Sequence, residues 1–168
     1  VDRGNFPHYL LKEISESPRS FRKTLRGKVV EEGGRLRVRL GRSVLSDSLR
    51  EQLRGGKIRR ILTIGQGTAA IAALGVAGAL ELALEKSAIA IATMPATELS
   101  GFRMRDDMSD TLIVAISQSG TTTDTNRTVD LVRSRGATVV AIVNRRGSDL
   151  TDKADGVLYT SDGRDVEM

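Results

Sequence analysis

The chain has 168 residues, a net charge of +5 and 39% hydrophobic residues, which is enough for one domain with its own apolar core. The absence of cysteine and the single histidine, His8, exclude disulfides, thiolate metal sites, cysteine nucleophiles and sites built from several histidines. No stretch is long and apolar enough to span a membrane, and no secretory signal opens the chain, so we expect a cytoplasmic globular domain without metal or cofactor.

The first third of the chain is basic. Residues 1–60 carry 16 Lys and Arg against 7 Asp and Glu, whereas residues 61–168 carry 10 against 14. A basic segment can bind nucleic acid, but no aromatic residues are interleaved here for base stacking. We therefore interpret it as a solvated surface and do not expect a nucleic-acid partner. Because the first residue is Val rather than Met, we expect a piece of a longer protein.

Residues 1–57 predict an irregular N-terminal arm of helices and a hairpin. Apolar residues at helical spacing indicate a helix over 8–17, and Pro18 suits the first position of a second helix that Gly27 ends. The strict alternation of residues 35–40, preceded by Gly33 and Gly34, predicts a β-hairpin over 28–40. A short helix capped by Ser46 or Asp47 then runs to residue 53.

Residues 58–168 predict a regular alternation of strands and helices. The expected strands are 58–64, 88–93, 111–116, 138–143 and 156–159, and the expected helices are 68–84, 96–103, 122–135 and 149–154. The second to fourth strands are continuous apolar runs, which is typical of a parallel sheet covered on both faces. The sequence therefore predicts an α/β fold with an open, doubly wound, five-stranded parallel sheet in the flavodoxin-like order 2-1-3-4-5.

The loop after the third strand is the strongest functional signal. Residues 117–125, Ser-Gln-Ser-Gly-Thr-Thr-Thr-Asp-Thr, contain six hydroxyls, one amide and one glycine, and they open a helix. Helix N-termini favour anions, and hydroxyl and amide donors suit a phosphate monoester. The loop has no Lys, so it is not a Walker A loop. We predict a phosphate site, the alternative being a hydroxyl-rich segment that only caps the helix.

The loop after the first strand is expected at the same sheet edge. Its Gly65-x-Gly67-x-x-Ala70 pattern also fits a weak dinucleotide fingerprint, but the second strand does not end in the acidic residue that this fingerprint requires. Glu98 follows the second strand near the same edge. It is placed either to reach a sugar hydroxyl or to cap a helix or pair with Arg103, and the sequence does not separate these roles.

Four stretches of the chain resemble, in order, the isomerase half of the glutamine–fructose-6-phosphate aminotransferases, and in particular its first sugar isomerase (SIS) domain. They are His8-Tyr9-Leu10-Leu11-Lys12-Glu13-Ile14 with Pro18, the turn Gly67-Thr68, Glu98 with Phe102-Arg103, and Ser117-Gln118-Ser119-Gly120 with Thr122, Asp124 and Thr125. Together these stretches span nearly the whole chain. The last one is specific to SIS domains, and the first points to this enzyme family among them.

The resemblance implies a role for each matching loop. Ser117, Gln118, Ser119, Gly120 and Thr122 would hold the phosphate of a sugar phosphate. Gly67 and Thr68 would lie in the turn over the sugar. The family's catalytic base, its histidine partner and its Schiff-base lysine lie outside the part that this chain matches, so no catalytic residue is assigned here.

The resemblance also implies a transferase that makes glucosamine 6-phosphate from fructose 6-phosphate and glutamine, with no cofactor. The expected partners are a second SIS domain and a glutaminase domain in the parent chain, and a second copy in a homodimer. We expect a SIS domain over 58–168 that ends before a Val-Ala-Ser-Thr segment of the family, and therefore a fragment that is inactive alone. Two alternatives stay open: a sugar-phosphate sensor in a transcription regulator, and a divergent sugar-phosphate isomerase or deaminase.

The sequence departs from the family's pattern at four places. Gln66 and Ala69 stand where the family's first turn has Cys and Ser, and Thr121 stands where its phosphate loop has Glu. Gly101 adds a residue before Phe102, which shifts the Glu98 motif out of register. These departures leave open a different sugar substrate.

Overall fold

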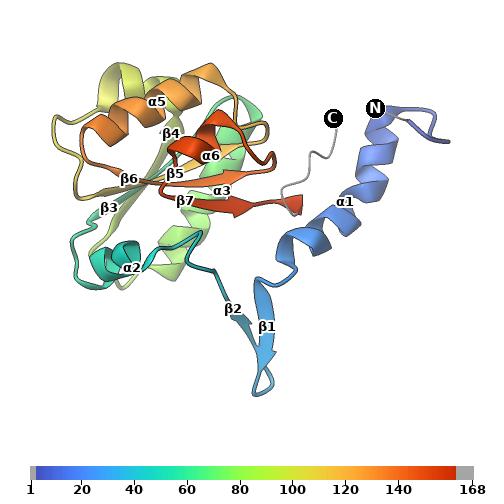
Figure 1. The fold of residues 1–168 in the computed structure, drawn as a ribbon, viewed down its shortest axis with the longest axis horizontal. Coiled ribbons are helices and arrows are strands. Elements are labelled where there is room, and N and C mark those ends of the chain that lie inside the picture. Colours follow the sequence, from blue (N-terminus) through green and yellow to red (C-terminus); the bar gives the residue numbers. More distant parts are fainter. Residues whose placement is uncertain (1–2, 162–168) are drawn as a thin grey trace.

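The computed structural model describes residues 3–161, which form a five-stranded parallel sheet with helices on both faces and an N-terminal helix and hairpin that project from it (Figure 1). The helices are α1 (Tyr9–Leu25), α2 (Asp47–Arg54), α3 (Thr68–Ala83), α4 (Ala96–Glu98), the π-helix η1 (Leu99–Arg103), α5 (Thr123–Ser134) and α6 (Asp149–Lys153). The strands are β1 (Val29–Glu32), β2 (Arg35–Val38), β3 (Arg60–Gly65), β4 (Ala90–Pro95), β5 (Thr111–Ser117), β6 (Thr138–Val143) and β7 (Gly156–Tyr159).

The large sheet has the order β4-β3-β5-β6-β7, and every neighbouring pair is parallel. This confirms the predicted 2-1-3-4-5 order. β4 lies on one side of β3, and the chain then crosses to the other side of β3 to form β5, β6 and β7. The carboxyl ends of β3 and β5 therefore flank the point where the strand order reverses, which is where open α/β sheets bind ligands.

Two apolar clusters fill the space between the sheet and its helices. On one face Ile113 and Ala115 of β5 pack with residues of α4, α5 and α6; on the other, Leu112, Val114 and Ile116 pack toward α2 and α3. Successive side chains of a strand point to opposite faces, so one apolar strand supplies both clusters. All seven residues of β5 are buried, which makes this strand the centre of the core.

The N-terminal helix corrects one prediction. Instead of two helices that meet at Pro18, a single helix α1 of 17 residues runs through Pro18, and Figure 1 shows it bending along its length. A proline inside a helix removes one backbone hydrogen bond and clashes with the preceding turn, so it bends the helix without having to end it. Pro18 alone predicts the start of a helix, but the apolar periodicity continues on both sides of it.

The hairpin and the short helix agree with their predictions. β1 and β2 pair antiparallel from Val29 opposite Val38 to Glu32 opposite Arg35, with Gly33 and Gly34 in the turn. The hydroxyl of Ser46 accepts a hydrogen bond from the Leu49 amide at 3.2 Å, so Ser46 rather than Asp47 caps α2. Figure 1 shows the hairpin extending away from the sheet.

The extra residue Gly101 lies within the π-helical turn η1. A π-helical turn closes hydrogen bonds between residues five apart rather than four, so it holds one residue more than an α-helical turn. The turn therefore absorbs the inserted residue locally, and the flanking strands β4 and β5 keep their parallel register on β3. Leu99 stays fully buried at the start of this turn.

Candidate functional site

The loops that follow β3 and β5 line one cavity at the carboxyl edge of the sheet. The cavity has a volume of about 220 Å³. Its walls are uncharged and consist of Gln66, Thr68, Ala69, Ile116, Ser117, Gln118, Ser119, Thr122 and Thr125. The two loops thus meet in the structure as their places in the strand order predict. We call this cavity the loop cavity.

Hydrogen bonds from the segments after β6 and from α5 hold the loop after β5 in place. The carbonyl oxygen of Gln118 accepts from the Asn144 and Arg145 amides at 3.2 and 3.3 Å. The carbonyl of Gly120 accepts from the Leu150 amide and from the side chain of Asn126, each at 3.0 Å. In a trans peptide the N–H points opposite to the C=O, so the amide of Ser119 points away from Asn144.

Two serine hydroxyls in this loop accept hydrogen bonds from the loop itself. Ser117 Oγ accepts from the Gly120 amide at 3.0 Å. Ser119 Oγ accepts from the Thr121 amide at 3.2 Å and from the Thr121 hydroxyl at 3.0 Å. A hydroxyl has one hydrogen to donate and two lone pairs. Internal donors occupy one lone pair of Ser117 Oγ and both lone pairs of Ser119 Oγ, and each hydroxyl still has its hydrogen to donate, which suits an anionic ligand.

Gly120 is required by the shape of the loop. Its φ is +68°, a left-handed conformation that side-chain-bearing residues rarely adopt. A Cβ at this position would collide with the side chain of Ser148 and would lie only 3.0 Å from a methyl group of Val143. The glycine therefore lets the loop lie directly against the segments that follow β6.

The helix that starts at this loop presents a hydroxyl with no partner. Thr122 is the N-cap of α5, but its side chain makes no capping hydrogen bond. Thr125, one turn into the helix, is 1% exposed, and its Oγ1 has no hydrogen-bond partner within residues 3–161. A buried hydroxyl without a partner is costly, so nearly all such groups in proteins are satisfied by protein, water or ligand. Thr125 lines the loop cavity, where a ligand oxygen would satisfy it.

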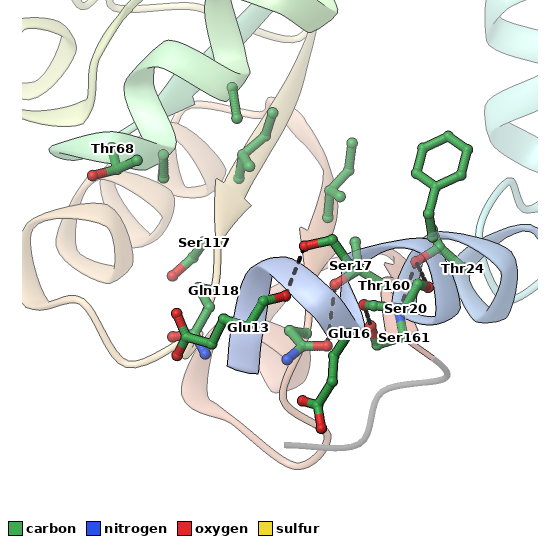
Figure 2. A pocket seen from close by; sticks show the side chains of 16 residues that line it. Glu13, Glu16, Ser17, Ser20, Thr24, Thr68, Ser117, Gln118, Thr160 and Ser161 are labelled. Atoms are coloured by element: carbon green, nitrogen blue, oxygen red, sulfur yellow. Dashed lines mark hydrogen bonds between the residues drawn. The ribbon is translucent and has the colours of Figure 1, made fainter. Parts of the chain in front are cut away.

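A second, larger cavity adjoins the first. It has a volume of about 590 Å³ and lies between α1 and the carboxyl ends of β5, β6 and β7 (Figure 2). Its lining includes Thr68, Ala69, Ile116, Ser117 and Gln118, which also line the loop cavity. We call it the α1 cavity. The shared residues place the two cavities side by side, one against the loop after β5 and the other against α1.

The predicted site residues divide into two groups by position. Ser117, Gln118, Ser119, Thr122 and Thr68 all line the loop cavity. Gly67 and Gly120 lie in the two loops but line neither cavity. Thr125 also lines the loop cavity, although no role is predicted for it from the sequence. Its place in the first turn of α5 is a usable signal, because first-turn side chains lie near the N-terminus of a helix.

Glu98 forms an ion pair rather than lining a cavity. Arg103 Nε lies 3.5 Å from Glu98 Oε1, and neither residue borders either cavity. Of the alternatives that the sequence left open, the structure shows the pair with Arg103. Both side chains are largely exposed, so the pair adds little stability.

Among residues 3–161, the carboxyl groups with displaced pKa values lie at the opposite edge of the sheet. A hydrogen bond from Arg105 is the largest cause that lowers the pKa of Asp110, and a hydrogen bond from the Ser109 amide does the same for Asp107. Both residues precede β5, whereas the cavities lie at its end. These shifts therefore concern stability and not the site. Within residues 3–161 there is also no cluster of metal-binding side chains and no helix long and apolar enough to cross a membrane.

The chain is similar in sequence to a known domain family and to curated enzymes. The family model of the SIS domain matches residues 56–167. Curated aminotransferases align over the whole chain. The glutamine–fructose-6-phosphate aminotransferase (isomerising) of Symbiobacterium thermophilum is 37% identical over 100% of this chain, and that of Thermus thermophilus is 35% identical over 99%. The chain spans 26% and 25% of the length of these two relatives.

Solved structures share the fold. The C-terminal domain of glucosamine-fructose-6-phosphate aminotransferase from Francisella tularensis matches with a TM-score of 0.74 and 23% identity, over 98% of this chain and 42% of that one. A phosphosugar isomerase fold from Silicibacter pomeroyi matches with a TM-score of 0.67 and 21% identity, over 92% and 42% of the two chains. With a family model that covers well over half of its length, this chain belongs to the SIS domain family.

Proposed function

We propose that this chain is the sugar-phosphate half-site of an isomerising aminotransferase that makes glucosamine 6-phosphate from fructose 6-phosphate and glutamine. The observation that carries the proposal is the buried, unpartnered Thr125 hydroxyl in an uncharged cavity lined by hydroxyl and amide groups at the start of α5. The full-length similarity to aminotransferases, with the N-terminal arm included, supports this enzyme over a sensor.

In this proposal the loop cavity holds the phosphate. Ser117, Ser119, Thr122 and Thr125 donate their hydroxyl hydrogens to its oxygens, and Gln118 donates from its amide. The N-terminus of α5 adds the positive end of a helix dipole. Neutral donors hold a phosphate reversibly, which suits a substrate that must leave as product. Thr68 borders the same cavity and faces the sugar.

The chain's own contribution is binding and orientation. The groups that open the sugar ring and move its protons belong to parts of the parent protein outside this chain, as do the glutaminase domain that supplies nitrogen and the second SIS domain. We further propose that the parent works as a cytoplasmic homodimer and that this chain alone does not turn over substrate.

A titration tests the phosphate site. Ser119→Ala removes one donor, so it should weaken fructose 6-phosphate and glucosamine 6-phosphate by about 1.5–3 kcal/mol, the usual value of a hydrogen bond to a charged group. Thermal-shift or calorimetric titration of this chain measures the loss. In the unchanged chain, a ligand at 100 times its dissociation constant should add about 2.7 kcal/mol of stability. Free fructose should give no shift.

Ser134→Ala is the matched control. Ser134 lies at the other end of α5, where its hydroxyl donates to the Leu131 carbonyl at 2.8 Å. This variant should bind both phosphates as the unchanged chain does. Equal binding of free fructose and fructose 6-phosphate, or full affinity in Ser119→Ala, would overturn the phosphate role of the loop.

A further inference from the structure

The α1 cavity lies where a ligand anchored in the loop cavity would extend. The two cavities share Thr68, Ser117 and Gln118, so a phosphate in the smaller one leaves the rest of the molecule facing the larger one. The larger volume, about 590 Å³, is within the range of small-molecule sites. One wall is the sheet edge and the other is the helix α1 (Figure 2).

The wall that α1 forms is tied to the sheet by hydroxyl groups. Ser20 Oγ shares a hydrogen bond with Ser161 Oγ just beyond the end of β7. The Ser161 amide donates to Thr24 Oγ1 at 2.9 Å. No residue of α1 is buried, so the helix adds little to the apolar core. Its contacts instead hold it across the carboxyl edge of the sheet.

This wall carries the charge of the α1 cavity. Among residues 3–161, the charged residues in its lining are Glu13 and Glu16, and none of these lining residues is Lys, Arg or His. Neither carboxylate has a side-chain hydrogen bond or an ion-pair partner in the part of the chain that the structure describes. Figure 2 shows Glu13 on the side of α1 that faces Gln118 and the phosphate loop. A carboxylate only accepts hydrogen bonds, so a ligand that contacts either one must bring a donor group.

We propose that Glu13 is a specificity-determining residue that binds the hydroxyl- and amino-bearing end of the sugar phosphate. Its negative charge favours an ammonium group and disfavours a second phosphate. Glu13 therefore selects an amino sugar phosphate over a sugar phosphate without an amine and over a sugar with two phosphates. Glu16 adds negative charge on the same wall. The proposal rests on the proposed phosphate site, because that site places the ligand within reach of α1.

Calorimetric titration of the whole chain at neutral pH tests this assignment. The ligands are glucosamine 6-phosphate, N-acetylglucosamine 6-phosphate, in which the amine is a neutral amide, and inorganic phosphate. Glu13→Gln should weaken glucosamine 6-phosphate about ten-fold or more, since it removes a charged hydrogen bond. It should weaken the N-acetyl compound less and leave inorganic phosphate equally or more tightly bound, because a nearby negative charge is gone. Glu51→Gln, at an exposed position of α2 that borders neither cavity, is the control and should change none of these values.

The outcomes separate the two proposals. Loss of amino sugar affinity in Glu13→Gln with inorganic phosphate retained supports the assignment. Equal affinities in Glu13→Gln and Glu51→Gln would overturn it, and binding of the sugar phosphates would then still support the phosphate site. If Ser119→Ala does not weaken any phosphate ligand, the phosphate site itself fails.

Discussion

The βα body and the N-terminal arm are held in place by different forces. In the body, residues 58–161, the central strand β5 is buried along its whole length between two apolar clusters. In the arm, α1 has no buried residue, and Phe21 is 67% exposed. Hydroxyl contacts at Ser161 hold α1, whereas apolar burial holds the body.

The difference matters for function, because each candidate contact comes from one of the two regions. The proposed phosphate loop follows the end of β5, where a fully buried strand determines its position. The candidate acceptor Glu13 lies on an element with few stabilising contacts. Elements with little buried surface open at lower free energy, so we expect α1 to open more readily than the sheet.

The largest expected contrast is between apolar truncations in the two regions. Ile113 is fully buried in β5, so Ile113→Ala should lower the free energy of unfolding by about 2–5 kcal/mol. Ile14 is 60% exposed on α1, so Ile14→Ala should change it by less than about 0.5 kcal/mol. Chemical denaturation of both variants measures the two changes. Similar losses would mean that α1 belongs to the cooperative core.

The glycines of the two regions give a second contrast. Gly120→Ala adds a collision with Ser148 to the cost of a positive φ, and it should lower stability by about 2–4 kcal/mol and abolish phosphate binding. Gly34 in the hairpin turn also has a positive φ, +73°, but nothing lies within 4 Å of its missing Cβ. Gly34→Ala should therefore cost only about 1 kcal/mol and leave phosphate binding intact. Thermal unfolding with and without fructose 6-phosphate distinguishes the two variants.

The smallest expected effect concerns acid stability. The hydrogen bond from Arg105 lowers the pKa of Asp110 in the folded state. Ionised Asp110 therefore stabilises the fold at pH values above 3.8, the ordinary pKa of an aspartate. This stabilisation is lost as the pH falls below that value. Asp110→Asn should cost less than about 1 kcal/mol at neutral pH, since the pair is partly exposed, and should make the acid unfolding curve shallower.

The control for this variant lies in the arm. Glu32 pairs with Arg37 and Arg39 on the exposed hairpin, so Glu32→Gln should shift the acid unfolding curve less than Asp110→Asn does. Denaturation midpoints between pH 2 and pH 7 provide the comparison. A larger shift for Glu32→Gln would show that the hairpin contributes more to stability than its exposure indicates.

The division of the chain into an arm and a domain at residue 57 stays a prediction. Residues just before this boundary pack against the body. Leu49 of α2 is 2% exposed and belongs to one of the two core clusters. The Val157 amide donates to the Ser43 carbonyl at 2.9 Å, which ties this segment to β7. The segment from Ser43 to α2 therefore packs with the body, although its composition groups it with the arm.

The sequence by itself determined the sheet order, the strand and helix alternation, and the place of the hydroxyl-rich loop at the end of β5. These features depend on local patterns: continuous apolar runs, helix caps and a hydroxyl-rich segment directly after a buried strand. The course of α1 through Pro18, the pair between Glu98 and Arg103, and the unpartnered hydroxyl of Thr125 were decided only by the tertiary structure. Each depends on contacts between residues or on competition between a local signal and its surroundings. The same holds for the position of Glu13, because a helix far from the loop in sequence reaches it only through the folded chain.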